Sequence, residues 1–167
     1  TGYGTVDFTL WPLFSQLILL LLMFIGGCAG STAGGLKVSR IVALVKLIFK
    51  KFQKAINPKR ITVVMYEKKS LNERVQNDIA LYFLLYVFTF IILVLLISFE
   101  NLDFTTTFSS VAATFNNIGP GLGAVGPKGN FAAFSDFSKC VFSFAMIAGR
   151  LEILPLILLF APSTWRP

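Results

Sequence analysis

The chain has 167 residues, 55% of them hydrophobic, and a mean hydropathy of +0.75. Its apolar stretches run without alternation, which excludes an ordinary soluble domain and indicates an integral membrane protein. Histidine is absent, which excludes His-based catalysis and metal sites, and nothing here resembles an enzyme. Cys28 and Cys140 lie in apolar or glycine-rich segments, so we expect packing roles rather than a disulfide or a metal site.

The first residues, Thr1-Gly2-Tyr3-Gly4, look like the end of an ion-filter loop. No initiator Met, basic signal region or pore helix precedes them, so we expect the C-terminal part of a longer protein. The apolar segment Leu13 to Ile25 follows and is predicted to enter the membrane as a helix.

Five glycines in ten residues then interrupt that helix, about 20 Å along it at 1.5 Å per residue. A flexible stretch at this depth could cross a pore and act as a gate. The alternative is a small-residue surface for close helix packing. The predicted gating loop comprises Gly26, Gly27, Cys28, Ala29, Gly30, Ser31, Thr32, Ala33, Gly34 and Gly35.

The net charge of +7 is concentrated between Lys37 and Arg74, where eleven Lys and Arg residues face only Glu67 and Glu73. A basic stretch of this kind could bind nucleic acid. Because membrane segments flank it, the positive-inside rule explains it better and places residues 37–76 in the cytoplasm. We therefore expect no nucleic-acid partner.

Residues Val75 to Phe99 are predicted to span the bilayer outward, and Phe104 to Phe115 is too short to span. It is predicted to be a re-entrant pore helix that delivers the loop at 116–121. Irregular backbone at this depth is tolerated where it lines a water-filled path, and its carbonyls can replace the hydration shell of an ion. The alternative is a plain turn, because Asn, Gly and Pro are common turn residues.

Asp136 to Phe160 is predicted to be one helix running inward, so that the C-terminus is cytoplasmic. It carries Arg150 about 21 Å along its length, where a buried arginine costs roughly 2.5–3.5 kcal/mol. One interpretation places Arg150 in the lumen as an electrostatic barrier to cations. The other is an arginine that reaches the cytoplasmic interface or forms a structural ion pair. Glu152 faces another side of the helix and need not be its partner.

The predicted fold class is all-α and integral to the membrane, built from helix–pore loop–helix repeats as in potassium channels. Residues 1–54 supply the filter end and broken second helix of one repeat. A basic cytoplasmic linker follows at 55–76, and residues 77–167 form a complete repeat.

Three stretches, 26–37, 116–123 and 149–153, resemble the TrkH family, the membrane subunits of Trk-type bacterial potassium uptake systems in the Trk/Ktr/HKT superfamily. The resemblance covers essentially the whole chain. It implies four repeats around one pore, of which this chain supplies the end of the third and all of the fourth. Ala33, where the family usually has glycine, and Cys140, where an aromatic is common, are departures.

The resemblance implies that K⁺ is the transported ion and that no other cofactor is bound. It implies filter glycines at Gly2 and Gly119, a gating loop at 26–35 and a barrier at Arg150. It also implies a homodimer in the bacterial inner membrane and a cytosolic nucleotide-binding regulatory subunit of the TrkA kind. The residues that would bind K⁺ through backbone carbonyls are Thr1, Gly2, Tyr3, Asn116, Asn117, Ile118 and Gly119.

The residues leave passive conduction and symport with Na⁺ or H⁺ both open. Two further hypotheses compete with a potassium pore. One is a Ktr- or HKT-like system that couples to Na⁺ or admits it. The other is a non-conducting membrane scaffold whose glycine loops only pack helices, in which Gly119 would tolerate serine at a cost in stability alone.

Overall fold

A computed structural model describes residues 4–28, 30–31, 34–58, 65–66, 69–151 and 153–160. The fold is all-α, as the sequence predicts, apart from one short antiparallel hairpin. The helices are α1 (Leu13–Ile25), α2 (Val38–Ile56), α3 (Glu73–Ile97), α4 (Phe104–Phe115), α5 (Asp136–Leu151) and α6 (Ile153–Phe160). The hairpin pairs β1 (Met65–Tyr66) with β2 (Lys69–Ser70), and single 3-10 turns lie at Phe8–Leu10, Ser98–Glu100 and Gly123–Val125.

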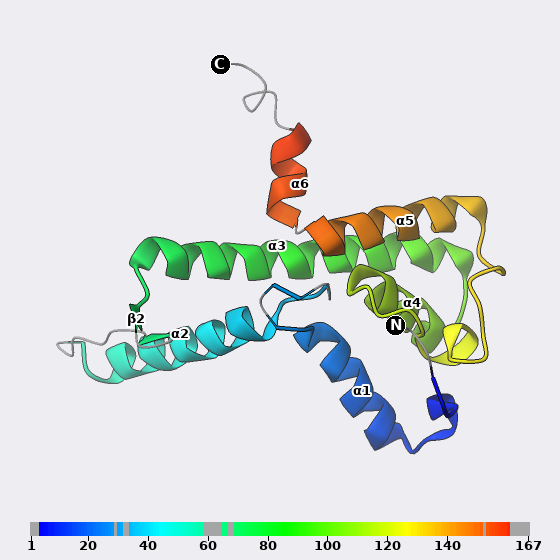
Figure 1. The fold of residues 1–167 in the computed structure, drawn as a ribbon, viewed down its shortest axis with the longest axis horizontal. Helices are drawn as coiled ribbons and strands as arrows, with labels where there is room; N and C mark the ends of the chain where they lie inside the picture. Colours follow the sequence, from blue (N-terminus) through cyan, green and yellow to red (C-terminus); the bar gives the residue numbers. More distant parts are fainter. Residues whose placement is uncertain are drawn as a thin grey trace.

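Helix α3 is the longest helix, and α2, α4, α5 and α6 all contact it (Figure 1). Helix α2 packs along one half of it, while α4 and α5 pack against the other half and against each other. Helix α1 contacts α4 from the opposite side. The loop between α1 and α2 therefore lies where the two halves meet (Figure 1).

An aromatic cluster joins these helices at the centre. Phe90 of α3 makes edge-to-face contacts with Phe24 of α1 and Phe108 of α4, each with ring centroids 5.1 Å apart. The Tyr86 ring of α3 lies 4.8 Å from that of Phe115 at the end of α4. Such pairs add about 0.5–1.5 kcal/mol each beyond their area burial, so they hold α4 firmly against α3.

Helix α3, with the turn that follows it, is the one helix among the described residues that is long and apolar enough to cross a membrane. Helix α1 has only 13 residues, or about 20 Å at 1.5 Å per residue. It ends at the predicted residue because Gly26 takes a positive φ of 69°, a conformation open to glycine.

The predicted single helix from Asp136 to Phe160 is wrong. Helix α5 ends at Leu151, and α6, which begins at Ile153, turns steeply away from it (Figure 1). Pro155 explains the division, since its missing N–H cannot bond to the Leu151 carbonyl and its ring would clash with that oxygen. In the first turn of a separate helix, a proline costs nothing of this kind.

Two smaller differences concern the linker and the cysteines. Helix α2 extends to Ile56 and α3 begins at Glu73, so the segment between them is shorter than the predicted 55–76 and includes the hairpin. Cys28 and Cys140 are both exposed free thiols, not packed side chains as expected.

Candidate functional site

Helix α4 is short and rich in hydroxyl side chains, yet almost wholly buried. Its hydroxyls are satisfied locally: Ser110 donates to the Thr107 carbonyl (2.8 Å) and Thr114 to the Ser110 carbonyl (2.8 Å). At its start Asp103 accepts a 2.9 Å hydrogen bond from the Thr106 amide. Hydrogen bonds from Thr106 hold the pKa of Asp103 below its ordinary value. A polar helix can therefore be buried without orphaned groups.

Helix α4 ends in a Schellman turn. The Asn117 amide donates to the Thr114 carbonyl (3.1 Å) and the Ile118 amide to the Ala113 carbonyl (2.9 Å). Asn117 adopts the left-handed conformation that this turn requires, with φ of 54°. Gly119 follows at φ 113°, a value that side chains rarely allow. Asn117 and Gly119 thus fix a sharp reversal of the backbone at 116–119.

The backbone after this turn is hydrogen-bonded to two buried hydroxyls of α4. Ser109 exchanges two hydrogen bonds with Leu122: its hydroxyl accepts from the Leu122 amide (2.8 Å) and donates to the Leu122 carbonyl (3.0 Å). The Thr106 hydroxyl accepts from the Ala124 amide (3.1 Å). The loop is therefore held rigidly along the helix that precedes it.

The turn presents one exposed side and one buried side. Asn117 and Gly119 are exposed, whereas Asn116 is buried. The exposed side borders an open cavity of about 390 Å³, lined by Ala113, Thr114, Asn117, Ile118, Gly119, Phe131 and Met146. Because this is the C-terminal end of α4, the negative end of its helix dipole favours a cation here, by about 0.3–1 kcal/mol at an exposed site.

The glycine-rich loop returns against the other side of the turn. Backbone hydrogen bonds fold it back: the Leu36 amide donates to the Phe24 carbonyl (3.4 Å) and the Val38 amide to the Gly27 carbonyl (3.1 Å). In consequence Gly34 and Gly35 are buried, while Cys28, Gly30 and Ser31 are exposed.

Gly34 and Gly35 lie in direct contact with Asn116. A Cβ on Gly34 would come 2.8 Å from the Asn116 carbonyl oxygen, and a Cβ on Gly35 would come 2.9 Å from Asn116 Oδ1. These distances are shorter than side chains tolerate, so the approach requires glycine at both positions. The loop is thus seated on the turn.

Two other helices meet the same turn. Asn117 Nδ2 donates to the Met146 carbonyl of α5 (3.2 Å). Tyr86 of α3 donates its hydroxyl to Asn116 Oδ1 (2.6 Å). Elements from residue 34 to residue 146 therefore converge on two consecutive asparagines.

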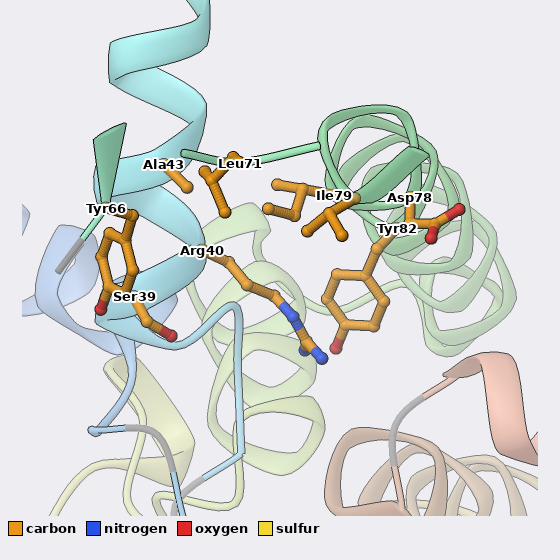
Figure 2. A pocket seen from close by; sticks show the side chains of 9 residues that line it. Ser39, Arg40, Ala43, Tyr66, Leu71, Asp78, Ile79 and Tyr82 are labelled. Atoms are coloured by element: carbon orange, nitrogen blue, oxygen red, sulfur yellow. The ribbon is translucent and has the colours of Figure 1, made fainter. Parts of the chain in front are cut away.

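The first turn of α2 fixes the far end of the glycine loop. The Arg40 guanidinium lies 4.1 Å from the centre of the Tyr82 ring on α3, at the edge of a cavity of about 340 Å³ between the two helices (Figure 2). A cation is attracted to the face of an aromatic ring by roughly 0.5–2 kcal/mol, so this contact holds Arg40 against α3. The loop is consequently held between Gly26, at the end of α1, and an anchored α2.

The N-terminal segment contacts the loop that follows the turn. Gly4 lies close to Pro127: a Cβ on Gly4 would be 3.4 Å from the Pro127 Cβ. The Asp7 carboxylate forms a salt bridge with Lys128 Nζ at 3.6 Å. Residues close to the N-terminus thus pack beside the loop that follows Gly119, although more than 120 positions separate them in the chain.

Comparison with known proteins identifies the architecture. Residues 1–166 match the family described as TrkH, a cation transport protein. The chain belongs to the TrkH family. It is 39% identical over 165 residues to the Trk system potassium uptake protein TrkH of Salmonella typhimurium, covering 99% of this chain and 34% of that protein. It is 37% identical to the Trk system potassium uptake protein TrkG of Escherichia coli K12, with the same coverage.

A solved structure supports the same conclusion. The crystal structure of the potassium transporter TrkH from Vibrio parahaemolyticus superposes with a TM-score of 0.88 at 38% identity, over 99% of this chain and 35% of that one. This confirms the all-α TrkH fold. The chain spans about a third of the length of these TrkH relatives.

The structure brings part of the predicted TrkH site together. Asn116, Asn117, Ile118 and Gly119 form one turn, with Gly34 and Gly35 seated behind it. Arg150 lies exposed in the last turn of α5, one residue before that helix ends, and not midway along a longer helix. Outside the described residues lie Thr1, Gly2, Tyr3, Ala29, Thr32 and Ala33.

Sequence reasoning missed the residues that hold the turn and the loop after it, chiefly Tyr86, Thr106 and Ser109, and the close contact of Gly149 with the Phe115 carbonyl. A signal existed for the first. The buried face of α3 repeats every three or four positions, and Tyr86 lies on it among apolar side chains. A hydroxyl on such a face must find a partner.

Proposed function

We propose that this chain forms part of a potassium-conducting pore of a Trk-type uptake system. The observation that carries the proposal is the seating of Gly34 and Gly35 on the turn that ends α4. A buried, short helix aims its carbonyl end at an exposed glycine-containing turn, and a second, glycine-rich loop lies directly against it. The names of the relatives, which are potassium uptake proteins, support K⁺ as the ion.

In this proposal K⁺ exchanges its water for backbone oxygens of the turn at Asn117, Ile118 and Gly119, together with Thr1, Gly2 and Tyr3 of the other repeat. The positive φ values of Asn117 and Gly119 let consecutive carbonyls point toward one path. Asn116 contributes less directly, because its side chain and carbonyl oxygen face the protein.

The glycine-rich loop, residues 26–35, acts as the gate. It has few side chains to clear when it moves, and it is held at its ends by helices. Arg150 supplies an electrostatic barrier near the same level, since its charge opposes the passage of a cation. Whether the ion moves passively or by symport with Na⁺ or H⁺ is a separate property of the complete protein.

The surroundings follow from the same proposal. The basic segment 37–76 and the C-terminus lie in the cytoplasm of a bacterium, beneath its inner membrane. Helix α2 exposes an apolar face, with Val42, Val45, Phe49 and Phe52, which supports a homodimer or contact with lipid. Its lysines provide a surface for a cytosolic nucleotide-binding regulatory subunit of the TrkA kind.

Rubidium uptake tests the proposal. A full-length Trk subunit that carries this sequence is reconstituted in proteoliposomes with its regulatory subunit, and K⁺ or Na⁺ is added as competitor. Competition by K⁺ alone supports a potassium pore, and equal competition by Na⁺ supports the Ktr- or HKT-like alternative. In the Gly119→Ser variant we expect weaker discrimination against Na⁺. A loss of thermal stability with unchanged discrimination would instead support the scaffold.

A further inference from the structure

Asn116 is buried behind the turn with its side chain fully engaged. Its exposed fraction is 1%, its Nδ2 donates to the Ala112 carbonyl (2.8 Å), and its Oδ1 accepts from the Tyr86 hydroxyl (2.6 Å). The first bond stays within α4. The second bond crosses to α3, so the orientation of the amide depends on a different helix.

The same oxygen is the surface on which the glycine loop rests. Oδ1 would lie 2.9 Å from a Cβ on Gly35, and the Asn116 carbonyl would lie 2.8 Å from a Cβ on Gly34. Any rotation of the Asn116 amide therefore changes the space left for Gly35. Tyr86 and Gly35 are thus both fitted to one atom, Asn116 Oδ1.

We propose that Tyr86 is a positioning residue that, through Asn116 Oδ1, couples α3 and the filter turn to the seat of the glycine loop. This inference rests on the proposed function, in which that loop is the gate. With the hydroxyl in place, Oδ1 is fixed and the loop fits against it. Without the hydroxyl, Oδ1 is a buried acceptor with no donor, and the amide turns toward other donors at the expense of the loop.

Tyr86→Phe isolates this effect, because the ring keeps its packing against Phe115 and only the hydroxyl is lost. Ser110→Ala is the matched control: it also removes a buried hydroxyl from the same assembly, but one that bonds to the Thr107 carbonyl of its own helix. Both variants are made in the full-length Trk subunit described above.

The readout is basal rubidium uptake, measured without the regulatory subunit, and its competition by Na⁺. We expect Tyr86→Phe to raise basal uptake about 5-fold or more and to increase competition by Na⁺, with Ser110→Ala close to wild type. If both variants take up rubidium like the wild type and only their melting temperatures fall, the proposed coupling through Asn116 is wrong. If the wild-type protein takes up no rubidium even with its partner, the proposed function fails first, and the two failures are distinguished.

Gly35→Ala probes the same atom from the loop side, because its Cβ would meet Oδ1, and its φ of 81° adds backbone strain like that at Gly30. It keeps the Tyr86 hydroxyl, so it decides the matter if Tyr86→Phe does not fold. We expect it also to raise basal uptake. In the double variant with Tyr86→Phe the two fold-changes should not multiply, because both act through Oδ1. With Ser110→Ala they should multiply. Multiplicative behaviour in both pairs would show that Tyr86 and Gly35 are independent.

Discussion

Gly149 of α5 lies directly against the carbonyl oxygen of Phe115, the last residue of α4. A Cβ on Gly149 would overlap that oxygen and would come 3.1 Å from Asn117 Nδ2. Helix α5 can therefore approach the end of the pore helix only because position 149 has no side chain. The same approach brings the Met146 carbonyl within reach of Asn117.

Gly149→Ala should move α5 away from the turn. In a solvent-exposed helix, replacing glycine with alanine would stabilise the folded protein by about 1 kcal/mol. Here the added methyl group overpacks the contact, which costs about 1–3 kcal/mol. The sign of the change in unfolding free energy, measured by thermal melting in detergent, decides between them. Ser143→Ala on an exposed face of α5 should be close to neutral. An alanine at 149 that stabilises the protein would contradict the contact.

Gly34→Ala and Gly30→Ala form a matched pair within the glycine loop. Alanine at 34 meets the Asn116 carbonyl, whereas alanine at 30 meets nothing within 4 Å but must adopt a φ of 80°. We expect Gly30→Ala to cost about 1–2 kcal/mol of local conformational energy without altering selectivity. Gly34→Ala should alter the competition of Na⁺ with rubidium uptake. Equal ion selectivity in both variants would show that the contact between Gly34 and Asn116 does not affect selectivity.

Two variants of Asn117 distinguish its backbone role from its side-chain role. Asn117→Gly keeps the left-handed conformation and loses only the bond to Met146, whereas Asn117→Ala loses both. The melting temperature should therefore fall further for alanine, by the equivalent of about 1 kcal/mol. If glycine proves the more damaging residue, the side-chain bond and not the turn dominates.

Asp103 gives the structure a dependence on acid. Hydrogen bonds from Thr106 lower its pKa in the folded state below the ordinary 3.8. The stabilisation is therefore present above that value and is lost as pH falls through the lower folded pKa. Asp103→Asn retains an acceptor for the Thr106 amide, so melting curves between pH 5 and roughly pH 3 should be flatter than those of wild type.

Asp103→Ala is the companion variant, because it removes the helix cap that Asp103→Asn retains. Removing the acceptor should cost about 1 kcal/mol at neutral pH, where Asp103→Asn costs less. Identical melting temperatures for all three proteins at pH 7 would show that the start of α4 is held by its burial alone.

The elements whose ends have local causes could be predicted from the sequence. Helix α4 begins after the cap residue Asp103 and ends at Phe115, before Asn116 and Asn117. The prediction of 104–115 has the bounds that the structure has. The prediction of 13–25 for α1 is equally close, because Gly26 stops that helix by its own conformation. Pro155 is also a local signal, because a proline inside a helix breaks it, and it accounts for the division of the helix predicted from 136 to 160.

The sequence by itself determined the apolar helices, the short polar helix and the glycine loop, because these follow from composition and short motifs, and three motifs carry the resemblance to the TrkH family. Only the tertiary structure decided that Asn116 faces inward, that Tyr86 holds it, and that Gly34, Gly35 and Gly149 meet the turn. These contacts join residues 30 to 82 positions apart. No local conformational preference specifies these contacts. They form only when the helices pack, and the space left at each of these glycines has no room for a side chain.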